Sequence, residues 1–274
     1  RYQLEPAIFS IHQLDQFIKE LILQRKTAYP IHLKMETGMK RLGFELNELP
    51  QVIDMLQAQP EIHLKSVYSH LADSDNRRDK RFTEHQISRF KQAISLLEKQ
   101  VNYSFDQHLL NSEGVANFPE ASFDMVRLGI GMYGVSGNPI VKKQLKPVIS
   151  WFSSVSQVKK VKKGESAGYS RSFIADKDVT IAIVPVGYAD GFKRQLSNGK
   201  GSVFIEGHAC PVIGRVCMDM ILVDVGNMDV KEGDKVEIIG QHQPLEQLAA
   251  CMETIPYEVM TGISRRVHRV YTEE

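Results

Sequence analysis

The sequence predicts an α/β domain followed by an all-β domain. In the first half, apolar runs typical of strands alternate with segments of helical periodicity, and from about residue 140 short β-type runs follow one another between glycine-containing turns. Hydrophobic residues make up 42% and charged residues 24% of the 274 residues, a composition typical of a folded globular chain. We therefore expect domains at 1–139 and 140–274.

The first half is expected to alternate helices and parallel strands. Ser10, with Gln13 three residues later, predicts the start of a helix whose apolar residues recur at helical spacing. Further helices are expected over 52–57 and 82–97, and strands over 31–36, 64–70, 105–110 and 124–129. A (β/α)8 barrel needs eight strands and roughly 250 residues, about twice what this half offers. The pattern by itself does not distinguish a small open sheet from a partial barrel.

Polar residues recur at the ends of the expected strands. These residues are Lys34, His70, Asn111, Ser112 and Arg127. Functional side chains of parallel α/β folds lie at the carboxyl ends of the strands, which share one edge of the sheet. We therefore expect the functional site of the first domain at this edge.

The second half is expected to be rich in antiparallel strands. Strand-like runs cover 151–161, 179–188, 201–207, 220–226 and 234–240, with one helix around 245–252. Asn198-Gly199 and Glu232-Gly233-Asp234 are expected to form turns.

Charge and cysteine content exclude several classes of function. The formal net charge of +1 argues against a nucleic-acid or anionic-membrane partner, and no apolar stretch is long enough to cross a bilayer. Cys210, Cys217 and Cys251 lack metal-ligand spacing, so we expect no metal site and a reducing, cytoplasmic location. Because Arg1 is not an initiator methionine, the chain is expected to be a piece of a longer polypeptide.

Seven segments together resemble the alanine racemases, in that family's order. They are 32–44 (HLKMETGMKRLGF), 69–75 (SHLADSD), 111–114 (NSEG), 123–134 (FDMVRLGIGMYG), 184–192 (VPVGYADGF), 211–219 (PVIGRVCMD) and 255–267 (IPYEVMTGISRRV). The resemblance implies an incomplete (β/α)8 barrel that binds pyridoxal 5'-phosphate (PLP), followed by a β domain. It also implies a homodimer with active sites at the interface. The implied activity interconverts L- and D-alanine and supplies D-alanine for cell-wall peptidoglycan.

The resemblance also assigns residues to the cofactor. Ser112 and the amides of Gly129 and Ile130 match the phosphate site, where small residues let N–H groups approach an anion. Arg127 matches the arginine that faces the pyridine nitrogen, and its permanent charge keeps that nitrogen unprotonated. His70 is implied to tune this environment. Arg265 stands where many relatives have a tyrosine that reaches the phosphate.

Substrate and proton-transfer roles follow in the same way. Tyr188 matches the base on the L-alanine face, which reaches the active site from the partner subunit. Arg41 matches the residue that binds the alanine carboxylate, and Met218 one that lines the small pocket. Lys34 matches a lysine that many relatives carry as a carbamate, which would orient Arg41.

One signature of the family is missing. The family's strand ending in lysine, followed by Ala-Asn-Ala-Tyr-Gly, does not occur in the sequence, and that lysine bonds to the cofactor and serves as the second base. The 274 residues alone are therefore expected to be inactive. The alternatives are a racemase of another small amino acid such as serine, or a non-catalytic module of a larger protein fused to a cell-wall ligase. The joint presence of Tyr188, Arg127, Arg41 and Ser112 favours a catalytic role.

Overall fold

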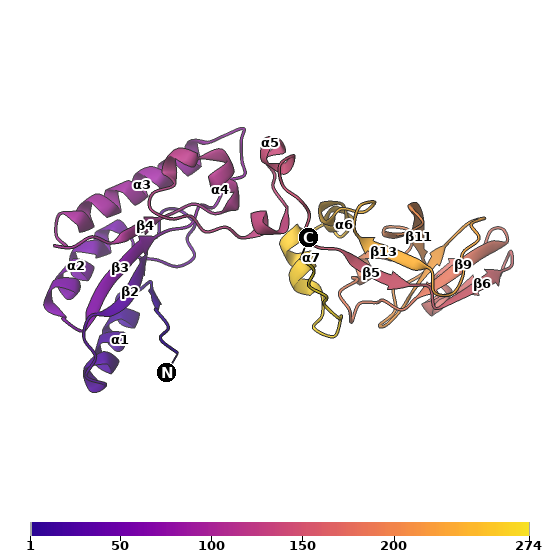
Figure 1. Cartoon of the computed structure of the whole chain (residues 1–274), viewed down its shortest axis with the longest axis horizontal. Coiled ribbons are helices and arrows are strands. Elements are labelled where there is room, and N and C mark those ends of the chain that lie inside the picture. Colours follow the sequence, from indigo (N-terminus) through magenta and orange to yellow (C-terminus); the bar gives the residue numbers. More distant parts are fainter. Residues whose placement is uncertain (1, 274) are drawn as a thin grey trace. The chain divides into compact units, whose positions relative to one another are not determined.

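The computed structural model describes residues 2–273 and divides into two compact units, Arg1–Lys146 and Pro147–Glu274. Figure 1 colours them along the chain, from indigo to magenta and from magenta to yellow. The sequence pattern placed the boundary after residue 139, and the short helix α5 (Pro139–Lys142) that follows that point belongs to the first unit.

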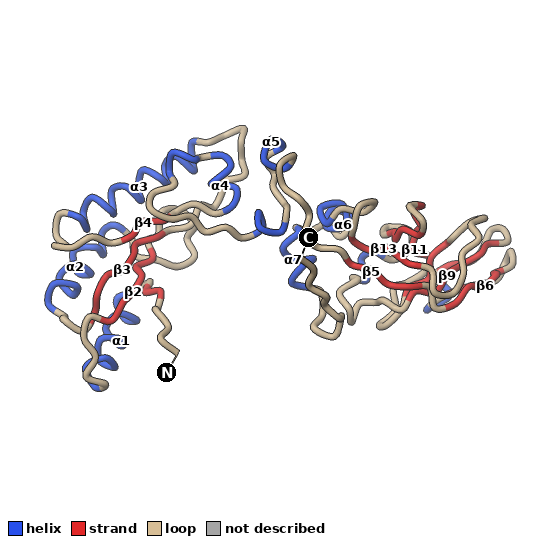
Figure 2. Tube along the Cα trace, in the orientation of Figure 1, coloured by secondary structure: helices blue, strands red, loops and turns tan. Residues whose placement is uncertain are grey.

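The first unit is built on a four-stranded parallel sheet in the order β1-β2-β3-β4 (Figure 2). Its strands are β1 (Ala7–Ile8), β2 (Tyr29–Lys34), β3 (Ile62–Tyr68) and β4 (Asp106–His108). The connections between consecutive strands contain α1 (Ile11–Leu23), α2 (Leu49–Ala58) and α3 (Arg81–Glu98). Later come α4 (Ser112–Asn117) and three 3-10 turns: η1 (Leu46–Glu48), η2 (Pro119–Ala121) and η3 (Ile130–Tyr133). This alternation confirms the expected α/β architecture.

Alternation along the strands separates the two faces of this sheet. Ile31 and Leu33 are fully buried and belong to one hydrophobic core with apolar residues of the three helices, such as Leu14, Val52 and Phe90. The intervening residues, paired across the strands, are polar or aromatic: His32 lies opposite Ser66, and Lys34 opposite Tyr68, which lies opposite His108. This register brings the carboxyl ends of β2, β3 and β4 level with one another.

The strand predicted over 124–129 is wrong. Only Met125 bridges to His108. Asp124 accepts the Gln107 N–H through its side-chain Oδ2 at 2.8 Å, where a continuing strand would offer a backbone carbonyl. Two backbone bonds, from Asp124 N to the Gln107 carbonyl at 3.1 Å and from Arg127 N to the Leu110 carbonyl at 2.9 Å, flank this bridge without extending it, and the chain runs on to η3.

The second unit is dominated by a seven-stranded sheet in the order β5-β13-β10-β11-β12-β9-β6, whose paired strands are antiparallel. Its strands are β5 (Trp151–Ser154), β6 (Gln157–Val161), β9 (Val179–Val184), β10 (Ser202–Ile205), β11 (His208–Ile213), β12 (Ile221–Asp224) and β13 (Lys235–Ile239). The remaining elements are β7 (Ser166–Ala167), β8 (Phe173–Ile174), η4 (Tyr169–Arg171), η5 (Arg194–Leu196), α6 (Leu245–Cys251) and α7 (Pro256–Gly262). The expected β domain is confirmed, and the sequence pattern missed β11 and α7.

Two local expectations are confirmed in this unit. Asn198 and Gly199 both have positive φ, 56° and 84°, as a tight turn requires, and Gly233 has a φ of 92°.

Among residues 2–273, no helix is both long and apolar enough to span a membrane.

Candidate active site

Polar groups at the strand ends of the first unit lie within electrostatic range of one another. Burial lowers the pKa of the Lys34 ammonium, and the guanidinium groups of Arg41 and Arg127 lower it further. Burial also lowers the pKa of His70, with further contributions from Arg127, Arg41 and Lys34. Of the polar residues expected at this edge, Lys34, His70 and Arg127 therefore lie near one another, and with Arg41 the cations form a region of positive potential suited to an anionic ligand.

Arg127 is held by backbone carbonyls on two neighbouring strand ends. Its Nη2 donates to the Ser69 carbonyl at 2.5 Å and to the Leu109 carbonyl at 3.3 Å, while Nη1 donates to the His108 carbonyl at 3.2 Å and to His108 Nδ1. The Tyr68 ring lies 5.1 Å from the guanidinium carbon. No protein acceptor within residues 2–273 takes the Nε–H, so a fixed guanidinium keeps one donor for a ligand.

Ser112 gathers backbone amides at the start of α4. Its Oγ accepts from Gly129 N at 2.9 Å and from Gly131 N at 3.1 Å, which leaves the hydroxyl hydrogen free to donate outward. The amides on Ser112 are thus those of Gly129 and Gly131, whereas no carbonyl or side chain of the described part of the chain accepts the Ile130 N–H. A Cβ built on Gly129 would meet nothing within 4 Å, so the space beside these donors is open. Open space beside small residues and free donors fits a phosphate.

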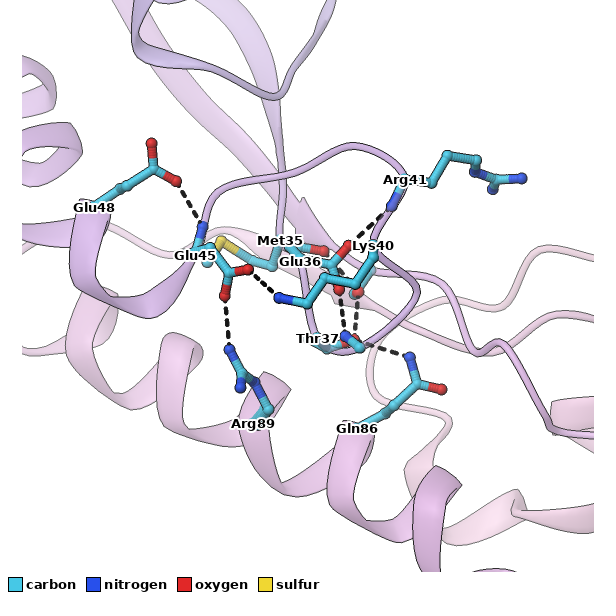
Figure 3. Close-up of polar contacts among 11 residues, drawn as sticks. Met35, Glu36, Thr37, Lys40, Arg41, Glu45, Glu48, Gln86 and Arg89 are labelled. Carbon is cyan, nitrogen blue, oxygen red and sulfur yellow. Dashed lines mark hydrogen bonds and ion pairs between the residues drawn. The ribbon is translucent and has the colours of Figure 1, made fainter.

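A rigid loop carries Arg41 (Figure 3). The buried Glu36 carboxylate accepts the Gly38 N–H and, at 3.3 Å, the Arg41 N–H, so it organises this loop instead of pairing with Lys34. Gly43 has a φ of +132°, and a Cβ there would lie 2.6 Å from Glu36 N, so no other residue fits. The backbone of Arg41 is therefore anchored, while its guanidinium points away from the other side chains labelled in Figure 3.

In the second unit, two loops carrying Tyr188 and Met218 are locked together. Tyr188 N donates to the Cys217 carbonyl and Ala189 N to the Met218 carbonyl, both at 3.0 Å. A Cβ on Gly187 would lie 2.3 Å from the Met218 carbonyl oxygen, so only glycine permits this approach. The Tyr188 and Met218 side chains are 42% and 53% exposed, which leaves both available to a ligand or a partner.

Arg266 ties the same two loops from a third segment. Its Nε donates to Asp190 at 2.7 Å and its Nη2 to Asp219 at 2.5 Å. Asp190 also accepts Gly187 N, and these bonds lower the pKa of the carboxyl despite the opposing effect of burial. The neighbouring Arg265, assigned to phosphate from the sequence, is exposed. The motifs missed Arg266, although two carboxylates in the matched segments were a sign that a cation was needed.

Two family models match the chain. "Alanine racemase, N-terminal domain" covers residues 1–137 and "Alanine racemase, C-terminal domain" covers 148–271. The alanine racemase of Clostridium novyi is 35% identical over 99% of this chain and 72% of its own length, and that of Treponema denticola is 36% identical over 100% and 75%.

Solved structures agree with this assignment. Alanine racemase from Streptomyces coelicolor superposes with a TM-score of 0.92 at 27% identity, over 99% of this chain and 73% of that one. Alanine racemase from Bartonella henselae, solved with covalently bound pyridoxal phosphate, gives 0.87 at 31% identity, over 98% and 74%. These matches confirm the expected fold class, and with models covering both units the chain belongs to the alanine racemase family.

Proposed function

We propose that the protein to which this chain belongs racemises alanine with PLP as the cofactor, and that the 274 residues supply part of the machinery. The observation that supports it most strongly is Arg127, a permanently charged donor fixed at the strand ends with one N–H to spare. Bound PLP supplies a conjugated ring that takes up electron density as the α-proton of an amino acid leaves. An arginine facing the pyridine nitrogen limits that uptake, because it does not hand over its proton. Limited uptake suits racemisation, in which the proton must return quickly to the α-carbon.

Further residues would hold the cofactor. The free hydroxyl hydrogen of Ser112 and the unpaired Ile130 amide would bind its phosphate, beside the open space at Gly129. Burial and the neighbouring cations lower the pKa of His70 and favour its uncharged form, so it would act as a hydrogen-bonding group. Arg265 would reach the phosphate as a second cation, a role assigned only from its position in the motif.

The substrate would be bound and deprotonated by residues of both units. Arg41 would bind the carboxylate, and a carbamate on Lys34 would orient Arg41 by accepting its N–H groups. Met218 would line the pocket for the methyl group. Tyr188 would remove or return the α-proton on the L-alanine face.

We propose a homodimer in which Tyr188 enters the site of the partner subunit. A cytoplasmic location fits the three cysteines, all free thiols. Fusion to a cell-wall ligase remains a proposal that sequencing the complete reading frame would test.

The function is tested with the product of the complete reading frame. L-alanine or L-serine is supplied with PLP, and D-amino acid formation is followed with D-amino acid oxidase. PLP-dependent formation of D-alanine, faster than that of D-serine, is the expected result. Faster formation of D-serine would replace the proposal with a serine racemase. Formation of neither D-amino acid would favour the alternative of a non-catalytic module.

A further inference from the structure

A chain of side-chain hydrogen bonds crosses the polar face of the first sheet, from Arg127 to Glu5. It links Arg127 Nη1 to His108 Nδ1, His108 Nε2 to Ser66 Oγ (3.0 Å), Ser66 Oγ to His32 Nδ1 (2.6 Å) and His32 Nε2 to Glu5 Oε2 (3.0 Å). The motifs singled out only Arg127, and the site described above uses none of the three residues beyond His108.

The chemistry of its two ends gives this chain of hydrogen bonds a single donor-to-acceptor direction. A guanidinium can only donate, so His108 Nδ1 must offer a lone pair. The pKa of His108 is lowered to about 4 by burial and by Arg127, so the ring is neutral near pH 7 and its proton lies on Nε2. That proton is donated to Ser66 Oγ, and the Ser66 hydroxyl therefore donates its own hydrogen to His32.

The far end requires the same direction. His32 Nδ1 accepts from Ser66, so a neutral His32 carries its proton on Nε2 and donates it to the Glu5 carboxylate. Glu5 also accepts from Lys65 at 2.7 Å on both oxygens, which lowers the pKa of the Glu5 carboxyl and keeps it an acceptor. A charged His32 would instead donate to Ser66. The Ser66 oxygen would then accept from both rings, and the Ser66 hydrogen would have no acceptor among these residues.

Burial makes Ser66 and His108, in the middle of this chain of hydrogen bonds, dependent on their side-chain partners. Ser66 is 1% and His108 6% exposed, so water cannot readily replace a lost bond. The Tyr68 ring stacks on His108 at 5.1 Å with an interplanar angle of 3°. A register shift between Ile31 and His32 skips Lys65, which places Ser66 opposite His32 and leaves Lys65 to pair with Glu5.

We propose that Ser66, His32 and Glu5 are positioning residues that hold His108 in its Nε2–H tautomer and thereby fix the guanidinium of Arg127. The tautomer assignment depends only on contacts within the first unit. Its consequence for racemisation, an Arg127 aligned for the cofactor, rests on the proposed function.

The assignment is tested by 15N NMR on the 274-residue chain labelled at its nine histidines. The His108 resonance is identified by its loss in His108→Asn. In the unsubstituted chain, His108 Nδ1 should show the shift of an unprotonated ring nitrogen, with the proton on Nε2. A protonated Nδ1 would overturn the proposal, and the tautomer itself is read from the unsubstituted chain.

Matched variants then test the individual hydrogen bonds of this chain. Ser66→Ala and His32→Phe should shift His108 towards a mixture of tautomers. Ser66→Thr keeps the hydroxyl, His32→Asn keeps an acceptor near the Nδ1 position, and His12→Asn changes an exposed histidine on α1, so all three should match the unsubstituted chain. An unchanged tautomer in both Ser66→Ala and His32→Phe would overturn the proposal.

Activity gives a separate readout. In the product of the complete reading frame, Ser66→Ala should lower kcat about tenfold, the effect of one hydrogen bond, with a smaller change in KM for alanine. Should that enzyme not racemise alanine at all, the proposed function fails while the NMR result stands.

Discussion

At the scale of single residues, Lys34 is a partly buried cation that lies within electrostatic range of two other cations. Partial burial lowers the pKa of its ammonium and the guanidinium groups of Arg41 and Arg127 lower it further, against a smaller opposing effect of the Glu36 carboxylate. Glu36, the carboxylate that could neutralise it, is engaged by the N–H groups of Gly38 and Arg41. A lowered pKa increases the fraction of neutral amine, which is the nucleophile towards carbon dioxide, and the resulting carbamate would place an anion beside the two arginines.

Lys34 is therefore expected to form a carbamate at neutral pH. The chain equilibrated with 13C-labelled bicarbonate should show a carbamate resonance that disappears in Lys34→Gln and persists in Lys163→Gln, a change at an exposed lysine. A resonance of equal intensity in both variants would refute the carbamate on Lys34.

Replacing Tyr188 tests the base proposed for one face of the substrate. In the product of the complete reading frame, Tyr188→Phe keeps the ring but removes the hydroxyl, and racemisation should fall about 10²- to 10⁴-fold, as for loss of a general acid–base group. Exchange of the α-proton of D-alanine in deuterated water should survive better than that of L-alanine. Equal exchange from both enantiomers would show that Tyr188 is not the base on the L-alanine face.

At the scale of elements, the sheet of the first unit combines an apolar face against helices with a polar face on which His108 must remain neutral. The His108 pKa lies at about 4 against an ordinary 6.5, so between these values the unfolded chain binds more protons than the folded one. The contribution of His108 to stability is therefore complete above pH 6.5 and is lost as the pH falls towards 4.

The free energy of unfolding should accordingly decrease between pH 6.5 and 4, and His108→Asn should show a shallower decrease. Asparagine offers Arg127 an acceptor but does not titrate. Urea unfolding at half-unit steps of pH measures both slopes, and identical slopes would contradict a neutral, buried His108.

The loops of the second unit give a steric prediction. Gly187→Ala places a methyl group against the Met218 and Cys217 carbonyls, so unfolding should become easier by about 1–3 kcal/mol. Gly262→Ala, at the end of α7, meets only the flexible Lys193 side chain at 3.4 Å and should change stability by less than about 1 kcal/mol. Urea unfolding compares the two, and an equal effect would mean that the loops are not locked at Gly187.

Local pattern predicted those elements whose residues alternate cleanly. The runs at 31–36 and 64–70 became β2 and β3 because Leu33 and Val67 are buried between polar neighbours. Of the strand expected at 124–129 only the bridge at Met125 forms, with the Asp124 side chain accepting the Gln107 N–H just before it, and β11 escaped notice because its pattern is interrupted by Pro211. Polar strand ends pointed to Lys34 and Arg127. The links from His108 to Ser66 and from Ser66 to His32 join residues 42 and 34 positions apart, a pairing that depends on strand register.

At the scale of the whole molecule, both units carry segments of one family, and each holds part of the proposed machinery. The first unit carries the residues proposed to bind the cofactor and the substrate carboxylate, and the second unit carries Tyr188 and Met218. The sequence contains no Lys-Ala-Asn-Ala-Tyr-Gly segment. The 274-residue polypeptide by itself should therefore show neither alanine turnover nor the visible absorbance of lysine-bound PLP, and robust turnover by it would show that another of its residues replaces that lysine.

The central claim, alanine racemisation, is tested most directly by following L-alanine in deuterated water with the product of the complete reading frame. Proton NMR reports loss of the α-proton, and a chiral assay reports D-alanine. We expect both to proceed with PLP and to be strongly slowed in Arg127→Ala. A protein that binds PLP but leaves the α-proton of alanine in place would contradict the account.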